Sequence, residues 1–279
     1  MSAGGWRFAF SRRWLGYLAF VVVFAIACVL LSMWQFARRE EARAEVIRVE
    51  QNWDAAAVPL NELVPDPAVF DPDDKYRSVE VTGTYLSEEQ LLVRGRPRSG
   101  QVGFEVLVPL LLEDGSVFIV DRGWVPGGDG QDAPDSVPSP PSGTVTVTAR
   151  LKAGEPVIPG RSAPDGQVAT INLPQIAERI GRPTVEGAYG LVASEDPSVA
   201  AAPAPAIRPE PDEGPHLSYA LQWIAFGVMG FVGLAWAVRH EYRLRNEDDP
   251  AVRERAARRE ARAKRRPTDA DVEDALLDR

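Results

Sequence analysis

The sequence predicts two transmembrane helices that flank an exported α+β domain, a small antiparallel β barrel-like sheet with one or two helices. Two apolar segments, Trp14–Trp34 and Leu217–Val238, contain no charged residue. Each has about the 20 residues that an α-helix needs to cross a bilayer. Between them, Tyr76–Tyr85 and several later segments alternate polar with apolar residues, which is typical of half-buried strands.

These boundaries divide the chain into seven segments. Residues 35–51 are rich in helix-forming residues and lack Gly and Pro, so the first span is expected to continue as a stalk. The expected segments are a cytoplasmic N-terminus (1–13), transmembrane helix 1 (14–36), a helical stalk (37–58), the exported α+β domain (59–199), an Ala/Pro linker (200–215), transmembrane helix 2 (216–238) and a charged cytoplasmic tail (239–279).

Charge on either side of the second span predicts the orientation. Residues 209–216 contain no Lys or Arg, whereas residues 239–266 contain eleven. Positively charged loops stay in the cytoplasm. We therefore expect a multi-pass protein of the cell membrane with both termini cytoplasmic and the central domain extracytoplasmic, although Arg38, Arg39, Arg43 and Arg48 after the first span oppose this bias.

Two targeting signals compete with an uncleaved first span. Ser11-Arg12-Arg13 resembles a twin-arginine signal, and Ala25–Cys28 resembles a lipoprotein cleavage box. The apolar run nevertheless continues beyond Cys28 to Trp34, longer than the 7–15 apolar residues of a signal peptide. We expect the span to remain uncleaved.

The central domain is expected to contain five or six antiparallel strands. A hairpin is predicted around Asp114-Gly115, because this dipeptide suits a tight turn. A short helix is predicted over residues 173–180, with Pro174 near its start and Gly181 at its end. The expected strands are 76–85, 90–94, 104–112, 117–125, 144–151 and 187–193, with a mobile loop over 127–143.

Composition excludes several functions. From Glu40 to Pro215 there are 14 Lys and Arg against 29 Asp and Glu, a net charge of −15, which argues against nucleic-acid binding. Cys28 is the only cysteine, so an intramolecular disulfide is excluded. No P-loop, nucleophile elbow or metalloprotease motif occurs, and the two histidines, His216 and His240, flank the second span. We expect a domain that binds or positions a partner and is not an enzyme.

His216 is the one residue that suggests a cofactor. On a helix it would share a face with Tyr219, Trp223 and Gly227. Imidazole is a common axial ligand of haem iron, and a glycine lets a flat ligand or another helix approach closely. The alternative is an interfacial histidine with two aromatic residues of the membrane belt.

Five short motifs, in order, resemble the surfeit locus protein 1 family of cytochrome c oxidase assembly factors. The resemblance covers about Leu15 to Tyr242, and the two-span topology also agrees with that family. Ser32 departs from it, because a glycine is usual there, and so does Ala42, where a basic residue is usual. The motifs are Leu31–Arg38, Tyr76–Tyr85, Gly103–Leu110, Val120–Pro126 with its Arg122-Gly123-Trp124, and His216–Trp223.

The resemblance implies a membrane-anchored assembly factor or associated subunit of an aa3-type cytochrome c oxidase, helping haem a insertion or subunit maturation. Its expected partners are the haem-bearing subunit, the respiratory complex and the lipid bilayer. Haem a would bind transiently, with His216 as iron ligand and Tyr219, Trp223, Arg122 and Trp124 around it. Arg122 has two interpretations, a partner for a haem propionate or other carboxylate, or a buried ion pair that fixes the hairpin.

Two other functions stay open from the sequence. One is a permanent structural subunit of a respiratory supercomplex that binds no haem. The other is a cell-envelope binding module with an unrelated ligand.

Overall fold

The computed structural model describes residues 5–130, 132–246, 250, 253–254, 257–258 and 261. Most of the tail predicted over 239–279 lies outside these residues. The chain forms two compact units, which are described separately. The helical unit comprises Met1–Glu41 and Glu213–Arg279, and the β-domain comprises Ala42–Asp212.

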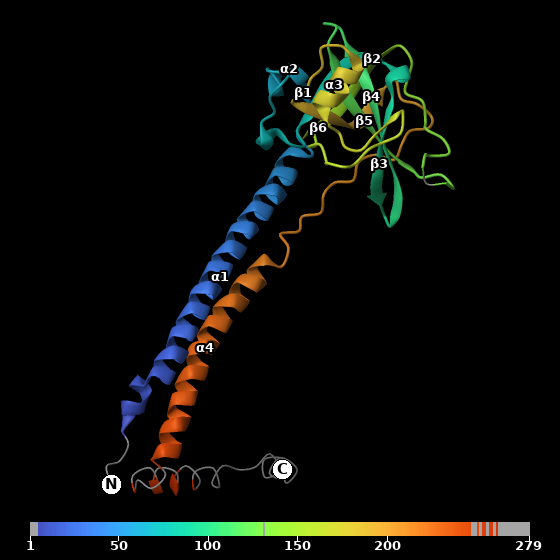
Figure 1. Cartoon of the computed structure of the whole chain (residues 1–279). Helices are drawn as coiled ribbons and strands as arrows, with labels where there is room; N and C mark the ends of the chain where they lie inside the picture. The colour runs from blue at the N-terminus through green and yellow to red at the C-terminus, as the bar shows by residue number, and fades with distance from the viewer. Residues whose placement is uncertain are drawn as a thin grey trace, which may run out of the picture. The chain divides into compact units, whose positions relative to one another are not determined.

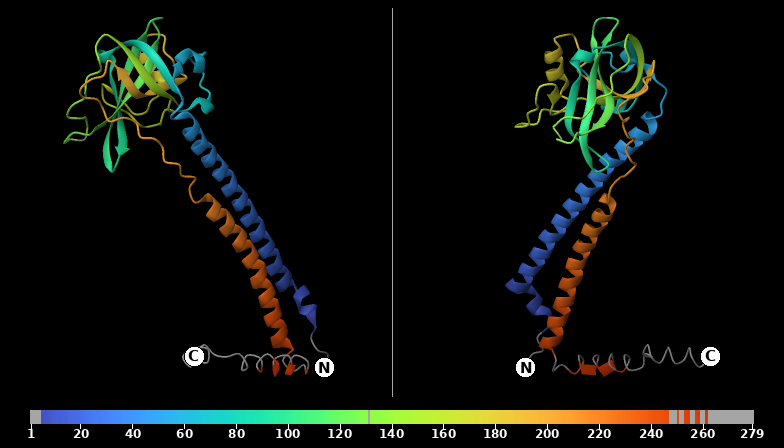
Figure 2. Two further views of the ribbon diagram at one scale, coloured as in Figure 1. Left: turned by 180° about the vertical axis from the view of Figure 1, so that it is seen from behind. Right: turned by 90° about the vertical axis from the view of Figure 1, so that its right-hand side faces the viewer.

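The helical unit contains a 3-10 turn, η1 (Trp6–Phe10), and two long helices, α1 (Arg12–Asn52) and α4 (His216–Arg245). Figures 1 and 2 show the helices side by side. Among the described residues, these two are long and apolar enough to cross a membrane, and only 11 % and 6 % of their most apolar windows are buried. A core helix of a soluble protein would bury that surface, so the exposed apolar faces indicate lipid as their surroundings.

Small residues let the two helices pack closely. Ala220 is fully buried, and its carbonyl accepts a hydrogen bond of 3.1 Å from the Ser32 hydroxyl. A Cβ added to Gly227 would lie 3.5 Å from that of Cys28. Close approach of backbones through small residues is a usual mode of helix association in membranes. The departure at Ser32 therefore has a structural role, because its hydroxyl links α1 to α4.

Helix bounds differ from the predicted segments. Helix α1 is continuous from Arg12 to Asn52, so the first span and most of the stalk are one helix, and residues 53–57 of the stalk are not helical. Helix α4 continues beyond the predicted span to Arg245. Helices do not end where hydrophobicity ends, because Arg and Glu are good helix formers.

The β-domain contains eight strands in its described residues, together with three short helices or turns and α3. Its elements are β1 (Val58–Pro59), α2 (Leu60–Leu63), η2 (Pro72–Asp74), β2 (Ser78–Tyr85), η3 (Ser87–Glu89), β3 (Leu91–Arg98), β4 (Gln101–Leu112), β5 (Val117–Pro126), β6 (Thr144–Ala153), β7 (Gln167–Val168), α3 (Leu173–Ile180) and β8 (Ala188–Asp196).

Pairing of β2 with β4 closes the sheet into a barrel. The strand order is β1-β2-β6-β8-β5-β4-β3-β7, and Gly83–Tyr85 of β2 also pair with Leu110–Leu112 of β4. The strands β2, β6, β8, β5 and β4 thus form a closed ring. The predicted barrel-like domain between two apolar helices is confirmed.

The sequence predicted antiparallel pairing throughout, but some of the strand pairs are parallel. β8 runs parallel to β5, and the short β1 and β7 run parallel to β2 and β3. The long connection through α3 brings β8 back between β6 and β5, antiparallel to the first and parallel to the second. Alternation along a strand says nothing of its direction, so the sequence could not distinguish these cases.

Two hydrophobic layers stabilise the β-domain. The first fills the barrel and includes Val79, Val106, Phe118 and Val147, all fully buried. The second covers the outer face of β4, β5 and β8 beneath α3. Helix α3 forms where it was predicted, with the Asn172 side chain accepting a hydrogen bond from the backbone N–H of Gln175 at its start and Gly181 in the left-handed region at its end.

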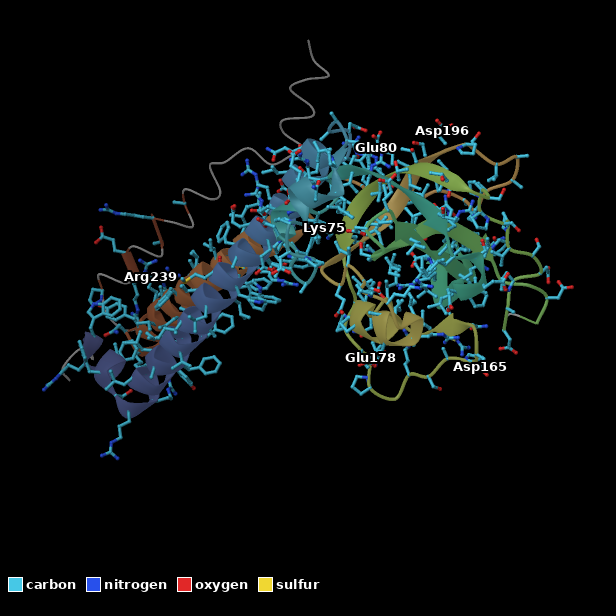
Figure 3. All side chains as sticks on the ribbon, turned by 90° about the horizontal axis from the view of Figure 1, so that it is seen from above. Lys75, Glu80, Asp165, Glu178, Asp196 and Arg239 are labelled. Carbon is cyan, nitrogen blue, oxygen red and sulfur yellow. The ribbon has the colours of Figure 1, made fainter. Side chains whose placement is uncertain are left out.

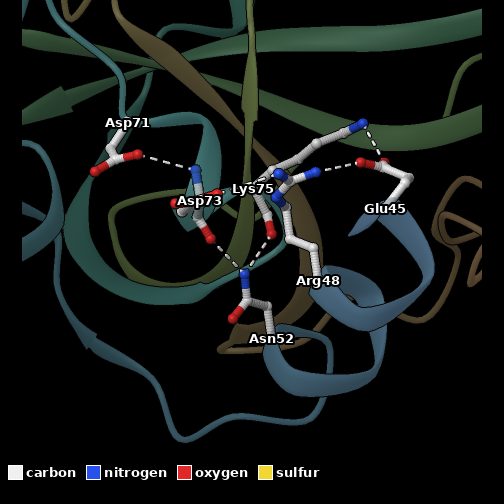
Figure 4. Close-up of polar contacts among 6 residues, drawn as sticks. All are labelled: Glu45, Arg48, Asn52, Asp71, Asp73 and Lys75. Atoms are coloured by element: carbon white, nitrogen blue, oxygen red, sulfur yellow. Dashed lines mark hydrogen bonds and ion pairs between the residues drawn. The ribbon is translucent and has the colours of Figure 1, made fainter. Parts of the chain in front are cut away.

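The last turns of α1 are part of the β-domain. Figure 4 shows Asn52 donating from Nδ2 to the carbonyl oxygens of Asp73 and Lys75, at 2.7 and 2.8 Å. Glu45 pairs with both Lys75 and Arg48, and Arg48 also reaches Asp73 at 3.1 Å. These contacts fix the end of the helix to the loop before β2.

Acidic side chains lie around the surface of the β-domain. Figure 3 labels Glu80, Asp165, Glu178 and Asp196, and all four residues are exposed. These four carboxylates are therefore solvated.

Candidate functional site

The structure places the predicted site residues in two separate groups. His216, Tyr219 and Trp223 lie on α4 in the helical unit. Arg122 and Trp124 lie on β5 in the β-domain.

His216 is the first residue of α4 and is half-buried. Its Nδ1 lies 2.9 Å from Oε1 of Gln35 on α1. An amide oxygen accepts hydrogen bonds, so this contact selects the tautomer with the proton on Nδ1, in which Nε2 carries the lone pair. Histidines that bind metals usually have this arrangement, in which the second nitrogen donates to an oxygen and fixes the tautomer. The ring therefore has the chemistry of an iron ligand.

The two aromatic residues differ in exposure. Tyr219 is 49 % exposed, whereas Trp223 is half-buried with its ring 5.8 Å from that of Phe226 in an edge-on contact. Gly227 was predicted to leave room for a flat ligand or a helix. The structure places helix α1 there, with Cys28 opposite Gly227. A porphyrin cannot also occupy that position, so any haem contact is limited to the part of α4 before Gly227.

A charged pair accompanies His216. Arg39 Nε lies 3.1 Å from Oε2 of Glu213, three residues before His216. Gln35 and Arg39 are four residues apart and thus on one face of α1. Gln35 lies within the predicted motif Leu31–Arg38, but its contact with His216, 181 positions further along the chain, could not be predicted from spacing.

Arg122 is held by a buried ion pair. Its Nε and Nη2 donate to the two carboxylate oxygens of Glu195 at 2.8 and 3.0 Å, and its Nη1 donates to the Pro138 carbonyl at 2.9 Å. The side chain is 1 % exposed. The Arg122 guanidinium and the Tyr85 hydroxyl keep the pKa of Glu195 low, although burial alone would raise it most strongly. The Arg122 side chain is thus not exposed to a haem propionate. Its geometry agrees with the other interpretation, a buried ion pair that fixes the hairpin.

A bulge at Gly123 separates Arg122 from Trp124. Glu105 pairs with Trp124 but Leu107 pairs with Asp121, so β5 has one residue more than β4 between these pairs. Gly123 takes φ +126°, a conformation that side chains rarely adopt. Asp121 and Trp124 consequently face the outer layer, whereas Arg122 faces the inside of the barrel.

Trp124 lines a cavity of about 330 Å³ on the outer face of the barrel. Its ring nitrogen donates to the Arg96 carbonyl at 2.8 Å, and the Arg98 guanidinium lies 5.8 Å from the ring. The cavity was not predicted, because its lining comes from seven separate parts of the β-domain. The lining residues are Tyr76, Arg96, Pro97, Arg98, Glu105, Asp121, Gly123, Trp124, Lys152, Leu191, Ala204, Ala206, Ile207 and Pro209.

One wall of the cavity is the strap, residues 203–209, which lies within the predicted Ala/Pro linker. The backbone N–H and carbonyl groups of Ala204 and Trp124 bond each other, both at 2.8 Å. Arg98 Nη1 donates to the carbonyls of Ala204 and Pro205. A Cβ on Gly123 would lie 2.4 Å from the Ala204 oxygen, so only glycine allows the strap to pack here. This part of the linker is a fixed element.

Charged groups within the cavity are incompletely paired. Asp121 is 3 % exposed, and burial and the neighbouring Glu105 carboxylate raise its pKa well above the ordinary value. Burial also raises the pKa of Glu105, partly opposed by Arg96. Arg96 Nε is 2.9 Å from Glu105 Oε2 but without a hydrogen-bonding angle. These groups alternate with apolar residues along separate strands, so their contact could not be predicted from the pattern of residues.

The comparisons with known proteins identify the family. A family model of the SURF1 family matches residues 22–228. The chain belongs to the SURF1 family. The matched range contains all five predicted site residues and both groups described above.

Relatives in the family agree with this assignment. An uncharacterised SURF1-like protein of Mycobacterium tuberculosis (strain ATCC 25618 / H37Rv) is 34 % identical over 249 residues, 87 % of this chain and 90 % of its own. A SURF1-like protein of Rickettsia bellii is 23 % identical over 75 % of this chain and 84 % of its own. The cytochrome oxidase assembly protein SHY1 of Saccharomyces cerevisiae is 34 % identical over 80 residues, 27 % of this chain and 20 % of its own.

Replacing Arg122 should destabilise the β-domain. Arg122→Met leaves the buried Glu195 carboxylate without its cationic partner, with only the Tyr85 hydroxyl still donating to it, and breaking such a pair costs about 3–5 kcal/mol. The double variant Arg122→Met/Glu195→Gln should lose less than the sum of the single losses. The free energy of unfolding of the full chain in detergent, followed by near-UV circular dichroism, measures this. Arg208→Met is the matched control: its pair with Asp54 is exposed, so about 0–1 kcal/mol is expected. If Arg122→Met and Arg208→Met lost the same free energy of unfolding, the assignment of Arg122 to a stabilising buried ion pair would be contradicted.

The β-domain should become less stable as the pH rises and the buried Asp121 carboxyl loses its proton. A raised pKa means that the folded chain holds this proton more tightly than the unfolded chain does. Its stabilising effect is therefore full below the ordinary pKa and is lost as the pH rises towards the raised value. Asp121→Asn keeps an oxygen for the Gly123 N–H and should flatten this part of the profile.

The thermal unfolding midpoint of both proteins, measured between pH 4 and pH 9, checks this prediction. Asp114→Asn is the control of opposite sign, because hydrogen bonds from Ser116 lower the pKa of that exposed carboxyl. Replacing Asp114 should leave unchanged the loss of stability that accompanies rising pH. If the unfolding midpoints of wild type and Asp121→Asn changed identically with pH over the whole range, the raised pKa of Asp121 would be refuted.

Proposed function

We propose that this chain is a membrane-anchored assembly factor or associated subunit of an aa3-type cytochrome c oxidase. The observation that carries the proposal is the SURF1-family match, which begins in the first apolar helix, spans the whole β-domain and ends in the second. A yeast relative over 80 residues is itself named a cytochrome oxidase assembly protein. The chain would act by binding, without a catalytic step of its own, on the haem-bearing subunit of the oxidase.

The finer part of the proposal is transient binding of haem a at the start of α4. Supporting it, the His216 ring has its Nδ1 proton directed to Gln35, which leaves Nε2 for iron. Tyr219 and Trp223 would supply aromatic contact on the same helix. The haem would bring the redox-active iron that the oxidase requires, and the role of this chain would be to hold it. Arg122 and Trp124, which were also predicted around the haem, belong to the β-domain, and the proposal for the start of α4 does not depend on them.

The proposed location is the cell membrane, with both termini in the cytoplasm and the β-domain outside. Two apolar helices with exposed faces support the membrane location. The orientation rests on charge: residues 209–216 lack Lys and Arg, whereas Arg239, Arg243 and Arg245 follow the second span. The alternative functions are a permanent, haem-free subunit of a respiratory supercomplex and a cell-envelope binding module.

Deleting the gene should lower oxidase activity and the haem a content of membranes, while the oxidase polypeptides still insert. Complementation with wild type should restore both, and complementation with His216→Ala should fail to restore haem a, because the proposed iron ligand is missing. Difference spectra and oxygen consumption of membranes measure these outcomes.

Two variants separate iron binding from helix packing. His216→Gln keeps a side chain that can hydrogen-bond to Gln35 but cannot replace imidazole at the iron, so it should behave like His216→Ala. His240→Ala removes the other histidine of α4, whose ring stacks on Trp236 at 5.2 Å, and should complement like wild type. Unchanged oxidase in the deletion strain would refute the assembly role. Full complementation by His216→Ala would refute haem binding alone.

Reporter fusions test the orientation. A fusion at Gly130, in the β-domain, should be active outside the cytoplasm, because the acidic side of the second span is expected to be translocated. A fusion at Asp274, which lies outside the described residues, should be active inside. A cytoplasmic signal at Gly130 would reverse the topology without affecting the family assignment.

A further inference from the structure

A second cavity of the β-domain, the β2 groove, lies where the sheet closes into a barrel. On this edge of β2, the residues before Val81 pair with β1 and those after Thr82 pair with β4. No strand among the described residues pairs with Val81 or Thr82 on that edge. The groove has a volume of about 680 Å³ and is lined by α2 and the loop after it, by Glu80–Thr82, by the turn between β4 and β5, and by Pro183–Val185.

The β2 groove follows the bare edge of the strand and not one face of the sheet. Successive residues of a strand point to opposite faces. Val81 is buried and belongs to the layer inside the barrel, whereas its neighbours Glu80 and Thr82 are exposed, and all three line the groove. A bare edge offers backbone N–H and C=O groups to another strand. The groove therefore has the geometry with which an extended segment adds to a sheet.

Apolar side chains form the floor of the β2 groove. Leu60, Val64, Val81 and Val185 are buried members of the first hydrophobic layer and line the groove. The rim, which includes Asn61 of α2, is exposed. Small-molecule sites enclose most of the surface of their ligand, which an open groove cannot do. An apolar floor beneath an open rim suits an extended segment that buries alternate side chains.

The walls of the β2 groove are fixed by backbone hydrogen bonds. The Pro67 carbonyl accepts from the backbone N–H groups of residues 186 and 187 at 2.8 and 2.7 Å. The Val117 N–H donates to the Pro183 carbonyl at 2.8 Å, and the Val117 carbonyl accepts from the Val185 N–H at 2.9 Å. A partner need not order these walls when it binds, so less free energy is lost on binding.

The charge of the β2 groove favours a basic partner. Glu80, Glu113 and Asp114 line it, and no Lys or Arg is among the described residues that do so. All three carboxylates are exposed, as Figure 3 shows for Glu80. None of them forms an ion pair within the described part of the chain, and Asp114 accepts hydrogen bonds from Ser116 in the turn. A second copy of this acidic domain would bring like charges together, which disfavours self-association here.

We propose that the β2 groove binds an extended segment of a partner protein in which basic residues alternate with apolar ones. The segment lies along Val81 and Thr82 and forms backbone hydrogen bonds with this edge. Its apolar side chains pack on the floor, and its Lys or Arg side chains extend to the carboxylates of Glu80 and Glu113. The groove belongs to the β-domain alone, so the proposal depends neither on haem binding nor on the assembly role.

Binding of a fluorescein-labelled peptide, Lys-Val-Lys-Val-Lys-Val, to the full chain in neutral detergent at low ionic strength tests the proposal. Fluorescence anisotropy should show saturable binding of one peptide per chain. Glu80→Gln/Glu113→Gln should weaken binding about fivefold, the size expected for the loss of two exposed ion pairs. Glu88→Gln/Glu89→Gln is the matched control: it removes the same charge from exposed residues outside the groove, so it should bind like wild type.

Altered peptides test the geometry without changing the protein. Replacing every Lys by Glu should abolish binding, and replacing every Val by Ser should weaken it, because the floor is apolar. Successive N–H groups of a strand point to its two opposite edges, so two peptides are compared, N-methylated at the Lys or at the Val positions. Only the peptide whose methyl groups face β2 should lose affinity, by about tenfold.

Circular dichroism confirms the fold of both double variants. The proposal is overturned if the Lys-Val peptide does not bind, if the Glu-Val peptide binds equally well, or if the Lys-Ser peptide does. It is also overturned if the two double variants bind alike, or if the two methylated peptides do. A dimer of the chain that the Lys-Val peptide fails to dissociate, detected by sedimentation equilibrium together with an absence of peptide binding, would assign the groove to a second copy instead.

Discussion

The β-domain depends on one extra residue in β5. Without the bulge at Gly123, Arg122 and Trp124 would point to the same side of the sheet, because residues two apart in a regular strand do so. With it, Arg122 meets Glu195 inside the barrel and Trp124 meets the strap outside it. A single backbone conformation, φ +126° at a glycine, thus connects the inner layer, the cavity and the route of the chain towards α4.

The parts of the fold that local patterns determine could be predicted. Helix α3 has its N-cap, its proline and its terminal glycine within ten residues, and it forms over the predicted range. The hairpin of β4 and β5 has Asp114-Gly115 at its turn, and Gly115 takes the left-handed conformation as expected. The apolar helices were evident from composition, because a run of apolar residues has few other stable environments.

The site could be predicted only in part, because its contacts join distant residues. His216 and Trp124 were identified through motifs, but their contacts with Gln35 and with the strap were not predicted. Gly227 illustrates the limit: a glycine on a helix face predicts close approach but not what approaches, and here it is α1. Parallel pairing of β5 with β8 and the meeting of Lys152 with Tyr189 depend on strand order, which alternation does not encode.

The β-domain is attached to the two long helices by connections of unequal mechanical strength. On the α1 side, the helical backbone continues into the domain. Its last turns bind the loop before β2 through a hydrogen bond from Asn52 and ion pairs of Arg48 and Glu45. On the other side, a pull on residues 210–215 reaches the domain through the strap. The exposed Arg208–Asp54 ion pair, the Arg98 side chain and two backbone hydrogen bonds to Trp124 hold it, and a load at its end would break these contacts one after another. Tension between the membrane and the domain would therefore open the wall of the cavity before it disturbed the barrel.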